Sequence, residues 1–113
     1  MTSYETGKIF ESVAKFYLIC SGFRIIGQRI KNRHGEIDIL GQKGQDLYIF
    51  EVKKRQKKDQ AIAAISKKGL ERSINAFFEY EAKNQLKYRQ IFVKGIVFDH
   101  SVFPEIIDIN SLD

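Results

Sequence analysis

The apolar positions near the start of the chain recur at helical spacing. This holds from about Thr6 to Ser21, where the apolar residues are Ile9, Phe10, Val13, Ala14, Phe16, Tyr17, Leu18 and Cys20. The pattern predicts a helix, with Thr6 as its N-cap and Gly22 just beyond its end. Glu11 falls at the edge of the apolar face of this helix rather than opposite it.

The next part of the chain is patterned for strands. Three segments rich in apolar or alternating positions are Phe23–Ile30, Glu36–Leu40 and Leu47–Lys53. Polar Asn32–Gly35 separates the first two, and a turn region at Gly41–Asp46 separates the second from the third. Aromatic and β-branched residues make the third segment the strongest strand signal in the sequence.

A long helical pattern follows, from about Gln60 to Lys83. Gly69 lies inside it, and we expect a kink or break there because glycine disfavours a helix interior. Ile91–Phe98 reads as another strand, with a bulge at Gly95. Glu105–Ile109 is predicted to be a last short strand or a helical turn.

This order of elements, α-β-β-β-α-β, predicts an α/β domain with a mixed β-sheet flanked by helices. The first three strands are close enough in sequence for an antiparallel meander. The long helix then forms the crossover to a parallel neighbour. The 113 residues fit a single domain over residues 1–113.

Cysteine content and hydropathy limit the cellular compartments and the kinds of site that are expected for this chain. The single cysteine, Cys20, excludes an internal disulfide and a cysteine-based zinc site, and we expect it in the core. No apolar run reaches the length of a membrane span, and the first residues do not resemble a signal peptide. We therefore expect a cytoplasmic protein without a membrane partner.

The charge is unevenly distributed. The formal net charge is +5, and residues 51–72 alone hold eight basic and three acidic residues. The flanking parts carry +2 and −2, so they cancel. An excess concentrated in one segment favours a polyanionic partner. The residues that we assign to nucleic-acid binding are Lys54, Arg55, Lys57, Lys58, Lys67 and Lys68, with Arg72 on the same helical side. A second basic rim could come from Arg29, Lys31 and Arg33.

Two acidic residues are predicted to meet in the central hairpin. A two-residue type II′ loop at Gly44-Gln45 would place Asp38 directly opposite Glu51. Glu51 and Lys53 share one face of their strand, so Asp38, Glu51 and Lys53 would converge on one patch. The alternative is that Asp38 and Glu51 are ordinary residues on the solvated face of a hairpin, and that Lys53 only forms an ion pair with Glu51.

Facing carboxylates repel each other unless a proton or a cation lies between them. A hard divalent cation, Mg²⁺ or Mn²⁺, suits such oxygen ligands. It would lower the pKa of a bound water and polarise a phosphoryl oxygen. Lys53 could then orient the attacking water or stabilise developing negative charge, and Glu11 could bind the same metal directly or through water.

Several strings carry a family resemblance. Asp38 followed by Glu51-Val52-Lys53 resembles the PD-(D/E)XK nuclease superfamily. The wider strings Gly7–Ala14, Gly22-Phe23, Gly35–Leu40 and Ile49–Arg55 are similar to the YraN-type family, bacterial proteins for which endonuclease activity is expected. The resemblance covers roughly residues 7–98.

The resemblance implies a restriction-endonuclease-like fold. It also implies Asp38 and Glu51 as metal ligands, Lys53 as the catalytic lysine and Glu11 as the helix-borne acid of the site. Val52, between the two residues of the motif, is counted with the metal site.

Our first functional hypothesis is a metal-dependent endonuclease that hydrolyses DNA phosphodiester bonds, with branched or flapped DNA as candidate substrates. The alternative is a non-catalytic nucleic-acid-binding module on a nuclease-like scaffold, favoured by the concentrated charge and by the lack of an acidic residue in Phe92–Val97. A third hypothesis is an interaction domain that forms a homodimer through the aromatic helix residues Phe77, Phe78 and Tyr80.

Overall fold

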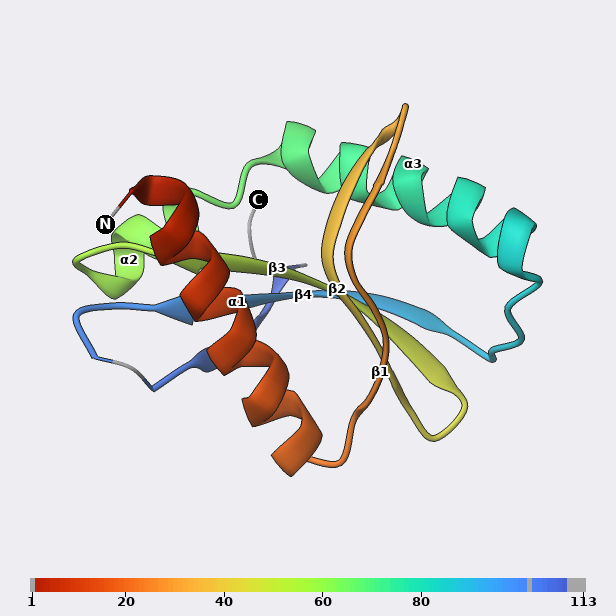
Figure 1. Ribbon diagram of the computed structural model, residues 1–113, viewed down its shortest axis with the longest axis horizontal. Helices are drawn as coiled ribbons and strands as arrows, with labels where there is room; N and C mark the ends of the chain where they lie inside the picture. The colour runs from red at the N-terminus through yellow and green to blue at the C-terminus, as the bar shows by residue number, and fades with distance from the viewer. Residues whose placement is uncertain (1, 102, 110–113) are drawn as a thin grey trace.

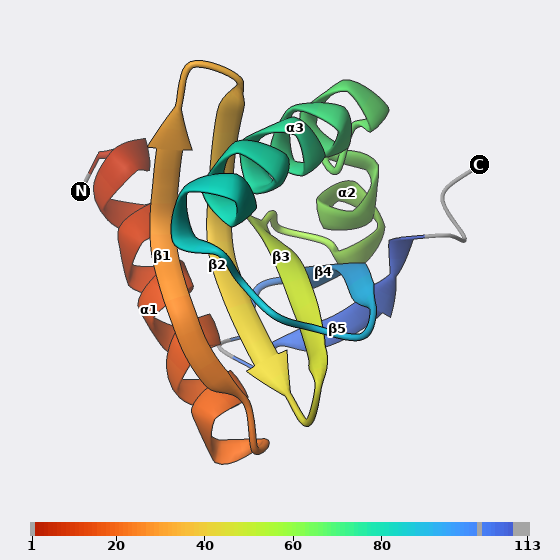
Figure 2. The same cartoon turned by 90° about the vertical axis from the view of Figure 1, so that its right-hand side faces the viewer.

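The computed structural model describes residues 2–101 and 103–109. Its centre is a five-stranded sheet in the order β1-β2-β3-β4-β5, with α1 on one face and α2 and α3 on the other (Figures 1 and 2). The elements are α1 (Ser3–Cys20), β1 (Arg24–Asn32), β2 (Gly35–Lys43), β3 (Asp46–Lys54), α2 (Lys58–Ala63), α3 (Lys67–Asn84), β4 (Ile91–Phe98) and β5 (Glu105–Asp108). The expected mixed sheet flanked by helices is confirmed.

Helix α1 begins one turn earlier than the apolar periodicity predicts. Thr2, not Thr6, is the N-cap: its hydroxyl accepts a hydrogen bond from the Glu5 amide at 3.1 Å, and the Glu5 carboxylate accepts one from the Thr2 amide at 3.3 Å. This reciprocal capping box satisfies two amides that the first turn leaves free. At the other end, Gly22 adopts a left-handed φ of 94°, as expected after a helix.

The β2–β3 hairpin has the predicted loop. Lys43 pairs with Asp46, so the loop is Gly44-Gln45, and only its first residue has a positive φ, 62° at Gly44. That is the pattern of a type II′ turn. The expected turn region over residues 41–46 is too long, because a two-residue loop leaves the polar residues before Gly44 free to remain in the strand.

The crossover between β3 and β4 contains two helices rather than one. The break lies at residues 64–66, before Gly69. Ser66 caps the start of α3 by accepting a hydrogen bond from the Gly69 amide at 3.0 Å. The interruption of the predicted helix therefore coincides with this N-cap and not with the glycine. The strands joined by this crossover, β3 and β4, pair in parallel as predicted, and β5 adds antiparallel to β4.

The prediction of a β-bulge at Gly95 is wrong. The register between β3 and β4 runs unbroken from Leu47 and Ile91 to Lys54 and Phe98. A Cβ atom at Gly95 would lie 2.6 Å from a methyl carbon of Ile65. The glycine therefore serves close packing of the segment after α2 against the sheet.

The core also corrects the expectation for Cys20, which is exposed. Helix α1 turns Ala14 and Leu18 fully into the core, and Cys20, two residues after Leu18, points to the other side of the helix. Of the aromatic residues on α3, Phe77 is buried and Phe78 is exposed. Within the described residues, no helix is both long and apolar enough to cross a membrane.

Candidate active site

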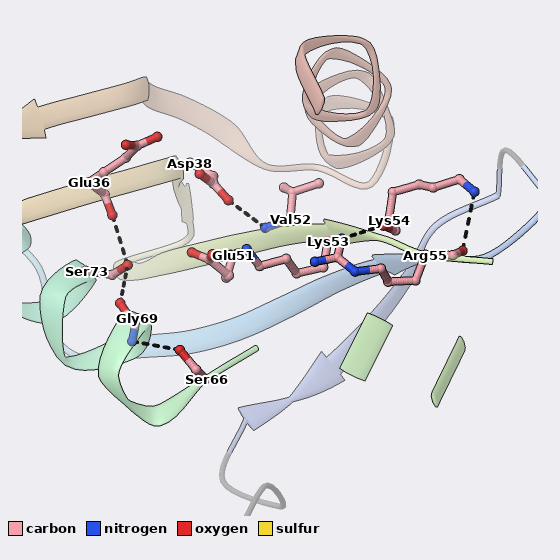
Figure 3. Close-up of polar contacts among 10 residues, drawn as sticks. All are labelled: Glu36, Asp38, Glu51, Val52, Lys53, Lys54, Arg55, Ser66, Gly69 and Ser73. Atoms are coloured by element: carbon pink, nitrogen blue, oxygen red, sulfur yellow. Dashed lines mark hydrogen bonds and ion pairs between the residues drawn. The ribbon is translucent and has the colours of Figure 1, made fainter. Parts of the chain in front are cut away.

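Strands β2 and β3 separate at the two predicted acidic residues. Among the described residues their ladder ends at the pair Ile39 and Phe50, one position before Asp38 and Glu51. The Val52 amide instead donates a hydrogen bond to the Oδ2 atom of Asp38 at 2.8 Å (Figure 3). The predicted register is thus confirmed as far as Ile39 and Phe50. Beyond this pair, the Asp38 carboxylate replaces a main-chain carbonyl of β2 as the acceptor for the Val52 amide.

Helix α3 holds the diverging end of β2. The buried Ser73 hydroxyl donates to the Glu36 carbonyl oxygen at 2.9 Å, and the Asn32 side-chain amide donates to the Ala76 carbonyl oxygen at 3.0 Å (Figure 3 shows the first contact). A Cβ atom at Gly35 would lie 2.5 Å from the Arg72 carbonyl oxygen. Gly35 therefore permits the close approach of β2 to α3 that opens the fork.

A cavity of about 640 Å³ occupies the fork between the first turns of α1 and α3. Four carboxylates from three elements line it: Glu11, Glu36, Asp38 and Glu51. Four cationic side chains also line it: Lys53, Lys54, Arg55 and Arg72. The mixture can hold a cation at its acidic wall and an anion at its basic rim.

Glu51 and Asp38 are two half-buried acids whose pKa values are both raised. Burial, and then the charge of Asp38, raises the pKa of Glu51 to about 7. Burial also raises the pKa of Asp38, although the hydrogen bond from Val52 opposes this. The Lys53 ammonium lies 3.4 Å from the Glu51 carboxylate, whose side chain is 16% exposed. The predicted convergence of Asp38, Glu51 and Lys53 is present.

Glu11 lines the same cavity but is engaged by Arg29. The Arg29 guanidinium contacts both carboxylate oxygens, with Nε 2.9 Å from Oε1 and Nη2 3.2 Å from Oε2. Burial and the charge of Asp38 raise the pKa of Glu11, while Arg29 lowers it. Arg29 is therefore not on the outer basic rim expected for it. The signal for its position is the register of β1 and β2, which brings Arg29 opposite Asp38.

The donor set fits a hard divalent cation. Asp38 and Glu51 supply carboxylate oxygens, and the Val52 carbonyl faces the same gap as its amide, because the two groups of one strand residue point the same way. Within the described residues, no three acidic, histidine or cysteine side chains converge as a metal cluster. Mg²⁺ is commonly held by one or two carboxylates and keeps several waters.

The predicted nucleic-acid-binding residues divide into two groups. Lys54 and Arg55 line the cavity. Lys67 and Lys68 are not among its lining residues, but they begin α3, whose Gly69 and Arg72 line it. Lys57 and Lys58 lie at the start of α2, where Lys58 forms an ion pair of 2.7 Å with Glu105. Glu36 and Ser73 are cavity residues that sequence analysis missed, because nothing in their local pattern distinguishes them.

Relatives of known sequence cover most of this fold. A UPF0102 protein of Nitrobacter winogradskyi is 38% identical over 67% of this chain and 64% of its own length. One from Rhodopseudomonas palustris (strain BisB18) is 36% identical over 67% of this chain and 56% of its own length. A third, from a Nitratiruptor species, is 37% identical over 77% of each chain.

The chain thus spans less than two thirds of the length of the first two relatives. The model of the uncharacterised protein family UPF0102 matches residues 10–99, from the first helix to the end of β4. That segment contains all four carboxylates and all four cationic residues of the cavity. The chain belongs to the UPF0102 family, which is the YraN-like family that its motifs resemble.

Proposed function

We propose that this protein is a metal-dependent endonuclease of the PD-(D/E)XK type that hydrolyses DNA phosphodiester bonds. The observation that carries the proposal is the fork between β2 and β3. It places Asp38, Glu51 and Lys53 together in a cavity with a basic rim (Figure 3). A half-buried acidic pair is costly for a fold that does not use it.

Each side chain has a task in such a reaction. Asp38, Glu51 and the Val52 carbonyl would hold Mg²⁺ or Mn²⁺, which lowers the pKa of a bound water and neutralises phosphate charge. Lys53 lies beside Glu51 and can orient the attacking water or stabilise charge on the phosphoryl oxygens. The water oxygen forms a new bond to phosphorus, the bond to one sugar oxygen breaks, and that oxygen leaves with a proton.

The basic rim supports the choice of a phosphodiester substrate. Lys54 and Arg55 follow Lys53 directly, and Arg72 faces the cavity from α3. An acidic site repels a phosphate backbone, so cations on both sides are needed to hold it there. Of the eight basic residues in residues 51–72, the four that line the cavity therefore lie where this substrate requires positive charge.

The test is cleavage of DNA by the purified protein. Supercoiled, linear, flapped and four-way-junction DNA are incubated with Mg²⁺ or Mn²⁺ and, separately, with EDTA. We expect cutting only with metal and a loss of at least about 100-fold in Asp38→Asn and Glu51→Gln, the scale of a lost charge-stabilising group. Glu105→Gln, an exposed acid on β5, is the matched control and should cut normally.

Failure to cut every substrate, or an Asp38→Asn protein as active as the wild type, would contradict the nuclease proposal. The alternative, a non-catalytic nucleic-acid-binding module, is favoured by one observation: no three-residue metal cluster forms among residues 2–101 and 103–109. It predicts binding in EDTA that Glu51→Gln retains. Loss of Lys54 and Arg55 should then reduce the salt dependence of binding.

A further inference from the structure

An exposed aromatic ring lies beside the candidate active site. Tyr4 is in the first turn of α1, whose Ser3, Thr6 and Gly7 line the cavity. The guanidinium carbon of Arg29 lies 5.1 Å from the centroid of the Tyr4 ring. The side chain is nevertheless 64% exposed, so a cation covers one ring face and the rest of the ring is open to solvent.

Arg29 connects this ring to the carboxylates. It falls between the pairs Gln28–Ile39 and Ile30–Ile37 of β1 and β2, which places it opposite Asp38. Its guanidinium also holds Glu11. The contacts of Arg29 with Glu11 and Tyr4 thus join β1 to the first half of α1.

The backbone of Arg29 is left-handed, with φ at 51°. This conformation is unfavourable for a residue other than glycine and persists only where surrounding contacts hold it. Here it directs the guanidinium towards Glu11 and Tyr4. The ring is therefore held next to the cavity-lining residues of α1 by an arginine that is itself bound to Glu11.

We infer that Tyr4, backed by Arg29, is a stacking platform for an unpaired nucleobase next to the phosphate in the cavity. This rests on the proposed nuclease function and specifies its substrate as single-stranded or flapped nucleic acid. Aromatic rings, with arginine beside them, bind base faces with little regard to sequence. Inside a duplex the base faces are already stacked, so the platform selects against fully paired DNA.

The exposure of Tyr4 sets it apart from the aromatic residues of the core. Phe77, which serves the core, is 1% exposed, whereas Tyr4 is 64% exposed. Tyr4 does not line the cavity itself, but its neighbour Ser3 does. Phe16, on the same helix but three turns further on, is exposed to a similar degree, 69%, and neither it nor an adjacent residue lines the cavity. Phe16 is therefore the matched control for an exposed aromatic residue that is remote from the site.

The test measures binding by fluorescence anisotropy in EDTA, with labelled oligo(dT) and a blunt duplex of equal length. Tyr4→Leu keeps an apolar side chain of moderate size but removes the aromatic face. We expect it to weaken single-strand binding by about fivefold to a hundredfold, the range for one stacked base, with duplex binding unchanged. Tyr4→Phe and Phe16→Leu should both bind as the wild type does.

The platform is refuted if Tyr4→Leu binds oligo(dT) like the wild type, if duplex binding falls equally, if Phe16→Leu loses as much, or if the wild type binds no nucleic acid. Cleavage of a flapped DNA with Mg²⁺ is measured separately. A protein that binds single strands through Tyr4 yet cuts nothing contradicts the nuclease proposal alone. A protein that cuts while Tyr4→Leu binds normally contradicts the platform alone.

Discussion

The two halves of β3 differ sharply although they are one continuous strand. From Leu47 to Phe50 the strand pairs with β2 on one side and β4 on the other, and three of these four residues are buried. From Glu51 to Lys54 it keeps only β4 as a ladder partner among the described residues, and its side chains are half-buried.

The difference shows how a small sheet builds a reactive site. The paired half lies between α1 and α3 and packs on both faces. In the open half, the place of β2 is taken by a cavity that charged side chains line. The core residue Phe50 and the candidate ligand Glu51 are adjacent in β3, so the same strand rigidly positions both.

Phe50→Ala tests the paired half and should have the largest effect. Phe50 is 1% exposed and contacts the rings of Phe23 and Tyr48. Its removal should lower the free energy of unfolding by about 3–5 kcal/mol, measured by urea denaturation followed by circular dichroism. A loss below about 1 kcal/mol would show that this half is not a packed core.

Gly35→Ala tests what keeps the fork open. The added methyl group would meet the Arg72 carbonyl oxygen at 2.5 Å, so β2 and α3 must move apart. We expect a loss of about 1–3 kcal/mol of stability, as for other overpacked sites, together with weaker metal or substrate binding. Gly44→Ala is a comparison at the hairpin loop, where a Cβ atom has open space but φ is left-handed; it should lose stability without affecting the cavity.

Glu51→Gln tests the open half of β3. Unlike the two preceding substitutions, it should raise the free energy of unfolding. The pKa of Glu51 rises from an ordinary 4.5 to about 7 in the folded protein. The folded chain therefore holds more protons than the unfolded chain between these values, and its stability falls as pH rises through this window. Without metal, Glu51→Gln should flatten this fall and stabilise the protein at pH 8 by on the order of 1 kcal/mol.

Thermal unfolding in EDTA from pH 4 to pH 8 measures that effect. The pKa of Asp38 is also raised, so the stability of the variant should still fall with pH, but less steeply than that of the wild type. A Glu51→Gln protein that is less stable than the wild type at pH 8 would mean that the carboxylate contributes to the fold rather than to a site.

Lys58→Ala should have the smallest effect. Its ion pair with Glu105 is about half-exposed on both sides, and such surface pairs contribute about 0–1 kcal/mol. Because Lys58 points to β5 rather than to the cavity, DNA binding should change less than in Arg55→Ala. Equal losses of DNA affinity in the two variants, compared by anisotropy at several salt concentrations, would extend the binding surface over α2.

Much of the architecture could be predicted from local patterns. The β3 segment is apolar and β-branched, Gly44 suits the first position of a type II′ loop, and a helical segment between two strands forms a parallel crossover. These features depend on residues close in sequence. The same reasoning brought Asp38, Glu51 and Lys53 together, because hairpin register follows from the loop.

The details that went wrong or were missed depend on distant contacts. Cys20 was assigned to the core, but packing of α1 on the sheet rotates it outward. The glycine at position 95 indicated a bulge, but its neighbours are Ile65 and Ile107 from other elements. The pairing of Arg29 with Glu11 joins β1 to α1, and no local periodicity predicts such a contact.

The sequence by itself determined the succession α-β-β-β-α-β, the hairpin register and the candidate residues for holding a metal and a phosphate, because period, turn chemistry and charge are local properties. It left open whether β5 is a strand, and it did not divide the crossover into α2 and α3. Only the tertiary structure decided where β2 leaves β3. That separation results from Ser73, Asn32 and Gly35 meeting α3, contacts that exist only after the chain has closed. The fork turns two acids on a hairpin into a half-buried pair that faces a cavity.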